Sequence, residues 1–185
     1  MVATISRYQF TVHEYTRMRA SGIFGENQRV ELIDGEVRTM SPIGPLHIAI
    51  VNRLNRLLSR QVGDAAIVSV QNAIQLDDYS EPQPDIVLLA PRADFYADAL
   101  TRPDDVLLLV EVADSSLAYD RDEKLPRYAA AGIPVVWIID VAGRCVEQHA
   151  NPRGSHYRTR EIASEGSLQL AAIAAMQIDL AQIFG

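Results

Sequence analysis

Apolar residues follow a helical period in two segments near the start of the chain. Thr11 and Glu14 form a capping-box pair that predicts a short amphipathic helix over residues 12–20. A second helix is predicted over residues 46–62, where apolar side chains recur on one face. That face consists of Ile50, Val51, Leu54, Leu57 and Leu58.

Elsewhere the pattern changes to short apolar runs that are typical of strands. Asp34 and Gly35 separate two such runs and form a strong hairpin signal. A helix over residues 121–131 separates the earlier strands from the later ones. At the end of the chain, Asp179 is expected to cap a last short helix that ends at Phe184. The predicted strands span residues 29–33, 36–40, 66–76, 85–89, 106–112, 135–139, 145–149 and 157–162.

The order of these elements predicts an α/β fold, a mixed sheet with helices on both faces. A helix crosses over between strands 106–112 and 135–139, so these two strands form a βαβ unit and should run parallel. The earlier strands have no helix between them and are free to run antiparallel. We expect one domain over residues 1–185, with an αβββαβ core, an N-terminal helix and hairpin, and a C-terminal hairpin extension.

Composition narrows the class of protein only a little. Cys145 is the only cysteine, which excludes an intrachain disulfide and fits a reducing compartment. The chain has no apolar stretch of membrane-spanning length and no apolar leader at its start, so a cytoplasmic protein without a membrane segment is expected. A formal net charge of -7 argues against non-specific binding of nucleic acid by the whole surface. It leaves room for a local basic patch beside an acidic centre.

The strand over residues 106–112 contains one residue that breaks its apolar pattern. Val106 to Val110 is an unbroken apolar run, typical of a strand buried on both faces. Glu111 follows where another apolar residue is expected. A buried ionised carboxylate costs several kcal/mol unless it is paired or coordinates a metal. The rest of the chain must therefore supply a compensating positive charge.

Asp85 brings a second carboxylate to the same edge of the predicted sheet. It starts one strand and Glu111 ends the next, so the two meet if these strands are antiparallel neighbours. Two such carboxylates need a cation between them, or one must hold a proton. Hard oxygen ligands suit Mg²⁺, Mn²⁺ or Ca²⁺ rather than zinc. Lys124 can reach them from the crossover helix, where it can position a metal-bound water or stabilise developing charge.

These residues, on an αβββαβ core, resemble the PD-(D/E)XK nuclease superfamily. The match is closer to one of its branches, the Uma-two family, which is described as restriction endonucleases. Each motif alone is common, but their order and spacing together are specific, and they cover nearly the whole chain. The motifs are Glu31-Leu-Ile-Asp-Gly-Glu36, Met40-Ser-Pro42 with His47, Gln83-Pro-Asp-Ile86, Val110-Glu-Val112, Asp120-Arg-Asp-Glu-Lys-Leu-Pro-Arg-Tyr128, Ala131-Gly-Ile-Pro134 and Trp137-Ile-Ile-Asp140.

The resemblance implies a restriction-endonuclease-like fold and metal-dependent hydrolysis of phosphodiester bonds in DNA. It implies that Asp85 and Glu111 are ligands of a divalent metal, Mg²⁺ or Mn²⁺, with the Val112 carbonyl as a possible third ligand. A homodimer is expected, because cutting a duplex needs two active sites or two events.

The resemblance also implies catalytic roles for Lys124, Glu31 and His47. In the parent motif the lysine follows the acid by two positions, and this chain has Ala113 there. Lys124 on the adjacent helix is therefore the candidate for the lysine role. Glu31 and His47 would complete the wall of the pocket.

Each candidate residue also has a purely structural interpretation. These are a salt bridge of Glu111 with Lys124 or Arg121, a turn cap for Asp85, a solvated helix position for Lys124, a core position for His47 and a cross-strand ion pair of Glu31 with Arg38. The stripe formed by Arg53, Arg56 and Arg60 is interpreted as a solvated helix face rather than a phosphate-binding surface. The alternative function is a catalytically inactive nuclease-fold protein that binds nucleic acid or a protein partner.

Overall fold

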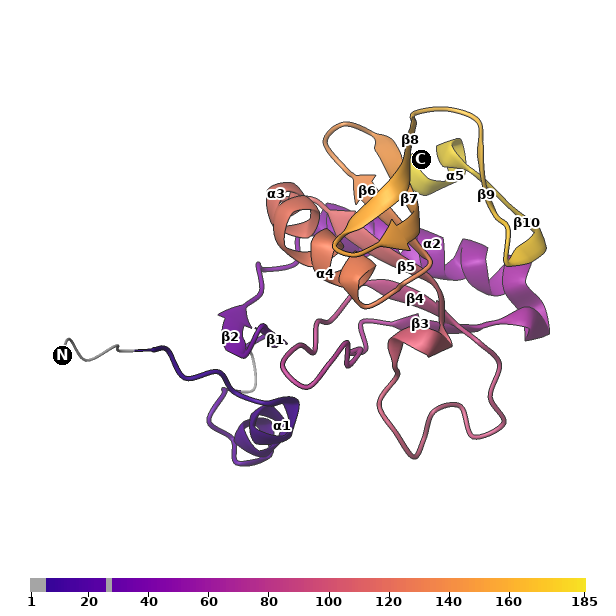
Figure 1. The fold of residues 1–185 in the computed structure, drawn as a ribbon. Helices are drawn as coiled ribbons and strands as arrows, with labels where there is room; N and C mark the ends of the chain where they lie inside the picture. Colours follow the sequence, from indigo (N-terminus) through magenta and orange to yellow (C-terminus); the bar gives the residue numbers. More distant parts are fainter. Residues whose placement is uncertain (1–5, 26–27) are drawn as a thin grey trace.

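A six-stranded mixed sheet forms the centre of the fold, with helices on both of its faces (Figure 1). The structure is a computed structural model that describes residues 6–25 and 28–185. The helices are α1 (Val12–Ala20), α2 (Pro45–Val62), α3 (Leu117–Tyr119), α4 (Leu125–Ala130) and α5 (Leu180–Phe184). A π-helical turn, Asp120–Lys124, joins α3 to α4, and 3-10 turns span Gly63–Ala65 and Pro103–Asp105.

The six strands of the central sheet lie in the order β3-β4-β5-β6-β7-β8. Strands β4 and β5 are antiparallel and β5 and β6 are parallel, which confirms the predicted βαβ crossover. Two further hairpins, β1–β2 and β9–β10, lie outside the sheet. The strands are β1 (Val30–Ile33), β2 (Glu36–Thr39), β3 (Ile67–Val70), β4 (Ile86–Leu89), β5 (Val106–Ala113), β6 (Val135–Asp140), β7 (Cys145–Arg153), β8 (His156–Ala163), β9 (Ser167–Leu170) and β10 (Ile173–Asp179).

Alternate residues of β5 point into two different apolar layers. Leu108 and Val110 pack in the layer that contains α2, α5 and the β9–β10 hairpin. Leu109 and Ala113 pack in the opposite layer, against Tyr128 of α4. The same alternation turns the side chain of Glu111 towards the α4 layer. The fold therefore delivers one acidic side chain into an otherwise apolar helix–sheet interface.

The β1–β2 hairpin is anchored beside this sheet by its turn. Asp34 and Gly35 both adopt left-handed backbone conformations, with φ of 50° and 75°, as a tight two-residue turn requires. A Cβ on Gly35 would lie 2.5 Å from the Cβ of Gln9, so the close approach of the preceding segment also demands glycine. The predicted hairpin is confirmed, and its first strand carries Glu31.

The crossover helix differs from its prediction. It begins at Leu117 rather than residue 121, and its middle is the π-helical turn Asp120–Lys124. The Leu125 amide donates to the carbonyl of Asp120, five residues back. Proline lacks an amide hydrogen and disturbs a regular helix, yet Pro126 is accommodated directly after this wider turn. A π turn of this kind is frequently found at a functional site.

Two strand predictions also need correction. The strand predicted over residues 66–76 ends at Val70, because Gln71 adopts a left-handed conformation with φ of 54° and turns the chain. The β9–β10 hairpin was not predicted, since its alanine-rich sequence lacks a clear strand pattern. The last helix is confirmed, with the Asp179 carboxylate accepting a hydrogen bond from the Ala181 amide.

Arg53, Arg56 and Arg60 lie on the exposed face of α2, as expected, and Arg53 also contacts the end of the chain. Its guanidinium donates to the carbonyls of Ile183 and Phe184, at 3.3 and 3.0 Å, and so caps the end of α5. Within the described ranges, no helix is both long enough and apolar enough to cross a membrane.

Candidate active site

Glu111 is buried at the end of β5, with 3% of its surface exposed. Its Oε1 accepts a hydrogen bond from the Lys124 ammonium at 2.9 Å and another from the Tyr128 hydroxyl at 2.5 Å. Lys124 is equally buried. The positive charge that the sequence demanded beside Glu111 is therefore Lys124 and not Arg121, which pairs with Glu147.

Lys124 is the only lysine in the chain, and the other sixteen basic residues of the lysine–arginine class are arginines. The π-helical turn brings Lys124 and Asp120 together on the buried side of the crossover. Lysine presents a compact point charge on a flexible stem, whereas arginine needs room for a planar fork. The narrow space between β5 and the crossover suits the ammonium group.

Glu31 enters the same charge cluster from the β1–β2 hairpin, although it is distant in sequence. Its Oε2 lies 3.4 Å from Nζ of Lys124 and accepts the Gln83 amide at 3.1 Å. The Tyr119 hydroxyl donates to Oε1 at 2.9 Å. Arg38 faces Glu31 in the strand register, as predicted, but pairs with Glu123 instead. Glu31 is thus part of the pocket rather than of a cross-strand ion pair.

Asp85 lies just before β4, on the same face of the sheet as Glu111. The β4–β5 register pairs Ile86 with Val110, and one further step places Asp85 opposite Glu111. Oδ2 of Asp85 accepts a hydrogen bond from the Val112 amide at 2.9 Å. Asp85 therefore belongs to the sheet edge that holds Glu111, as the antiparallel pairing predicted.

His47, in the first turn of α2, contacts both Asp85 and Val112. Its Nδ1 lies 3.0 Å from the Val112 carbonyl, and its Nε2 lies 2.9 Å from Oδ1 of Asp85. The second contact has ion-pair distance but not the alignment of a hydrogen bond, so the buried Nε2 has no hydrogen-bond partner among the described residues. The histidine side chain therefore stands directly against the oxygen atoms that would hold a metal ion.

Burial and charge shift the protonation equilibria of this cluster in different directions. Burial raises the pKa of Glu111 to about 8, although Lys124 opposes this shift. Burial alone would lower the pKa of Lys124, but Glu111, Glu31 and Asp120 outweigh it and raise the pKa. Burial also raises the pKa of Asp120. The lysine therefore keeps its charge, and Glu111 holds a proton more readily than an exposed glutamate does.

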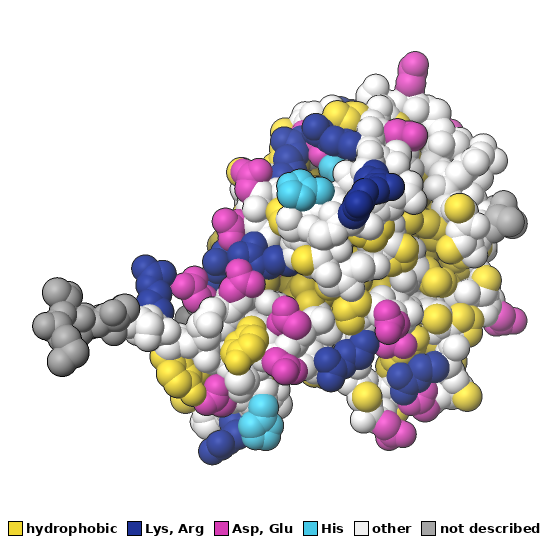
Figure 2. Space-filling model, in the orientation of Figure 1, with side chains coloured by type: hydrophobic (Ala, Val, Ile, Leu, Met, Phe, Trp, Pro, Cys, Tyr) yellow, Lys and Arg dark blue, Asp and Glu magenta, His cyan; other side chains and the backbone are white. Residues whose placement is uncertain are grey.

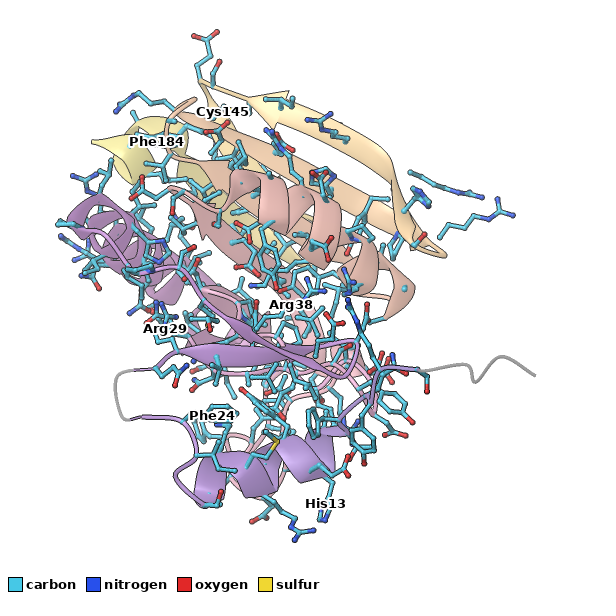
Figure 3. All side chains as sticks on the ribbon, turned by 90° about the vertical axis from the view of Figure 1, so that its left-hand side faces the viewer. His13, Phe24, Arg29, Arg38, Cys145 and Phe184 are labelled. Atoms are coloured by element: carbon cyan, nitrogen blue, oxygen red, sulfur yellow. The ribbon has the colours of Figure 1, made fainter. Side chains whose placement is uncertain are left out.

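These side chains line a cavity of about 350 Å³. Arg29 and Arg38 border it together with the loop after β2, and Figure 3 shows Arg38 between the hairpin and the crossover segment. The Arg38 guanidinium lies 5.9 Å from the centre of the Tyr119 ring, which fixes its orientation. The cavity therefore combines carboxylates at its base with arginines at its rim.

The oxygen atoms at the base suit a hard divalent cation. Two carboxylates, from Asp85 and Glu111, and the Val112 carbonyl all border the cavity. Within residues 6–25 and 28–185, no three His, Cys, Asp or Glu side chains gather closely enough to enclose an ion. This set fits an open site of the kind that Mg²⁺ accepts, with one or two carboxylates and the remaining positions left to water or phosphate.

Tyr119, Tyr128 and Gln83 contribute to the cluster, and sequence reasoning gave none of them a role. Tyr119 lies before the predicted helix start, so its position on the crossover was not foreseen. Tyr128 ends the motif Asp120–Tyr128 and follows Lys124 by four residues, a spacing that places both side chains on one face of a helix. Gln83 begins the motif Gln83-Pro-Asp-Ile86, but its contact with Glu31 is made by the backbone amide, which side-chain chemistry does not predict.

Comparisons with known proteins indicate a family and a fold for this chain. The Uma2 family model, described as "Putative restriction endonuclease", matches residues 12–181. A solved structure from Anabaena variabilis ATCC 29413, described as a "putative nuclease belonging to DUF820", is similar to the chain with a TM-score of 0.75. It is 15% identical, and the alignment covers 95% of this chain and 97% of that one, which confirms the predicted fold. No curated protein matches the sequence.

The raised pKa of Glu111 predicts how Glu111→Gln changes stability. The folded-state value of about 8 lies above the ordinary 4.5, so the stabilisation associated with this group is present below pH 4.5 and is lost as pH rises towards 8. Glutamine keeps an acceptor for Lys124 and Tyr128 without the charge. In EDTA at pH 8, denaturant unfolding should show the variant equal to or more stable than the parent, with a gain on the order of 1 to 3 kcal/mol.

The gain should shrink at pH 5, where both proteins carry a neutral side chain. Glu165→Gln, an exposed position, is the matched control and should show no such pH dependence. A Glu111→Gln protein clearly less stable than the parent at pH 8 would mean that the ionised carboxylate is a net stabilising partner of Lys124.

Proposed function

The chain belongs to the Uma2 family, and from that premise we propose that it is a metal-dependent endonuclease that hydrolyses phosphodiester bonds in DNA. One observation carries the proposal: Lys124 meets Glu111 at 2.9 Å on the sheet face that also holds Asp85. The lysine comes from the crossover helix rather than from the strand, yet its charge reaches the same carboxylates. A purely structural pair would not need the further acids and the cavity that surround it.

Asp85, Glu111 and the Val112 carbonyl are the proposed ligands of Mg²⁺ or Mn²⁺. When bound, such an ion polarises a phosphate oxygen and lowers the pKa of an attacking water. His47 contacts both Asp85 and Val112 in the structure, so its ring must yield or share those oxygens on metal binding. The raised pKa of Glu111 also implies competition with the metal, because the carboxyl proton must leave before a cation is held tightly.

Lys124 is proposed as the catalytic lysine. Its ammonium is held charged by Glu111 and Glu31 and borders the cavity. There it can donate to the attacking water or to a non-bridging oxygen of the phosphate, where negative charge develops. Tyr128 and Tyr119 hold the two glutamates in place by their hydroxyl groups. Glu31 is proposed to orient the ammonium group.

The proposed substrate is nucleic acid that approaches the cavity locally rather than over a broad basic surface. Acidic and basic side chains are interspersed on the face shown in Figure 2, in keeping with the net charge of -7. Arg29 borders the cavity and has no ion-pair partner among the described residues, so it is available to a phosphate. We infer that cutting both strands of a duplex would use two copies of the chain.

Cleavage of DNA should depend on Asp85, Glu111 and Lys124. Supercoiled, linear duplex and single-stranded DNA are incubated with the protein in Mg²⁺ or Mn²⁺, and products are followed on gels. Asp85→Asn and Lys124→Met should lower the rate at least about 100-fold, because each removes a charged group from the reacting centre. Asp104→Asn is the matched control, since Asp104 is exposed in the turn before β5.

Absence of cleavage by the parent protein on all three substrates, with DNA binding retained, would favour the inactive binding-protein alternative. Cleavage that survives Asp85→Asn would remove the proposed metal ligand from the mechanism.

Divalent metal should raise the melting temperature of the parent protein, because a ligand stabilises only the folded state that binds it. The open coordination predicts weak binding, so millimolar Mg²⁺ or Mn²⁺ is compared with EDTA in thermal melts. Asp85→Asn and Glu111→Gln should abolish the upshift, and Asp104→Asn should keep it. An unchanged upshift in Asp85→Asn would place the ion elsewhere on the protein.

A further inference from the structure

A second cavity, of about 360 Å³, lies beside the catalytic pocket. Helix α1, the start of β1 and the loop after β3 enclose it, and Figure 3 shows Phe24 between α1 and the hairpin. Arg29 and Gln83 line both cavities. A molecule in the second cavity would therefore be a direct neighbour of whatever occupies the first.

Glu81 is the unusual residue of this second cavity. It is 3% exposed, and its Oε1 has one ion-pair partner, the half-exposed Arg19, at 3.3 Å. Its Oε2 is buried and has no hydrogen-bond partner among the described residues. A buried acceptor without a donor is costly, and native proteins retain few such groups. Glu81 thus provides a hydrogen-bond acceptor in the second cavity, and the proposed catalytic mechanism does not use it.

The other polar side chains restrict the kind of ligand that the cavity can hold. Amide side chains from Gln28, Asn72 and Gln83 border it, along with the guanidinium groups of Arg19 and Arg29. The carboxylate disfavours an anion and the two guanidinium groups disfavour a cation. The density of donors and acceptors disfavours an apolar molecule. What remains is a neutral molecule that carries several donors and acceptors.

We propose that this cavity binds a nucleobase, preferentially guanine, from the nucleotide beside the bond that is cut; the assignment rests on the proposed nuclease function. Among the bases, guanine matches the site because its N1–H and amino group can donate to the Glu81 carboxylate. Its O6 and N7 can accept from Arg19 and the amide groups, as guanine commonly does from arginine. The volume lies in the range of small-ligand sites.

Two contacts connect this cavity to the catalytic pocket. Gln71, which borders it, has a left-handed backbone, and its Nε2 lies 3.4 Å from Oδ1 of Asp85. Gln83 places its side chain on the second cavity while its backbone amide donates to Glu31 at 3.1 Å. Strained backbone of this kind is found at ligand-binding sites. A bound base would therefore hold residues that touch Asp85 and Glu31.

Binding of short oligonucleotides tests the proposal independently of cleavage. Fluorescein-labelled single-stranded thymidine octamers with one central guanine, inosine or adenine are titrated with full-length protein, in EDTA and in Ca²⁺, and followed by anisotropy. The guanine octamer should bind about tenfold more tightly than the adenine octamer, the discrimination expected of one well-formed base contact. Inosine, which lacks the amino group, should fall between them.

Glu81→Gln should reduce the guanine preference to about twofold or less, because the amide replaces one acceptor oxygen by a donor. Asn72→Ala and Gln28→Ala change exposed side chains of the same cavity, so they test the site even if the buried substitution prevents folding. Each should weaken the preference. Asn52→Ala and Gln169→Ala are the matched controls, at exposed positions on α2 and β9, and should keep the preference.

Equal binding of the three octamers, or no measurable binding, in both conditions would overturn the proposal. So would a guanine preference that persists in Glu81→Gln and Asn72→Ala. A guanine preference that these substitutions remove, in a protein that never cleaves DNA, would retain the base site and reject the nuclease activity. Cleavage without base preference would do the reverse.

Discussion

The ion pair between Glu111 and Lys124 is the interaction on which the rest of this site depends. Taking two charges out of water is expensive, and their attraction repays that cost only when the geometry is good and the remaining donors and acceptors are satisfied. Here the satisfaction comes from three parts of the chain: β5 supplies Glu111, the crossover supplies Lys124 and Tyr128, and the hairpin supplies Glu31. The charge pair therefore ties the N-terminal hairpin to the sheet.

The same arrangement leaves the negative charge of the site only partly neutralised. Three carboxylates, from Glu111, Glu31 and Asp120, surround one ammonium group, and burial raises the pKa of Glu111 and of Asp120. Clustered carboxylates of this kind cost folding stability, and strongly perturbed carboxyl groups in a cleft are typical of functional sites. The negative charge of the cluster suits the cation of the proposed function, and His47 contacts the Val112 carbonyl and Asp85 beside it.

The positions of Asp85, Glu111 and Lys124 could be predicted because they follow from local sequence and simple topology. An acid at the end of an apolar run, a Pro-Asp at the start of its neighbour, and antiparallel pairing suffice to bring Asp85 and Glu111 to one edge. The partners of Glu31 could not be predicted in this way, because Tyr119 and Lys124 reach it from a segment far along the chain. The π-helical turn was missed as well, since Pro126 suggested a helix start and gave no sign of a wider turn. The burial of Glu81 could not be predicted from local sequence, because it depends on the tertiary arrangement of α1 and the hairpin.

The most direct test of this account measures the charge of Lys124 in the folded protein. Because Lys124 is the only lysine, isotope labelling of lysine gives a single side-chain NMR signal. In EDTA, that signal should remain that of a charged ammonium group when the pH is raised above ~10.4, the ordinary pKa of lysine. Glu111→Gln should lower the pKa of Lys124, because it removes a neighbouring negative charge. A Lys124 signal that titrates at or below the ordinary lysine value, or that ignores Glu111→Gln, would contradict the account.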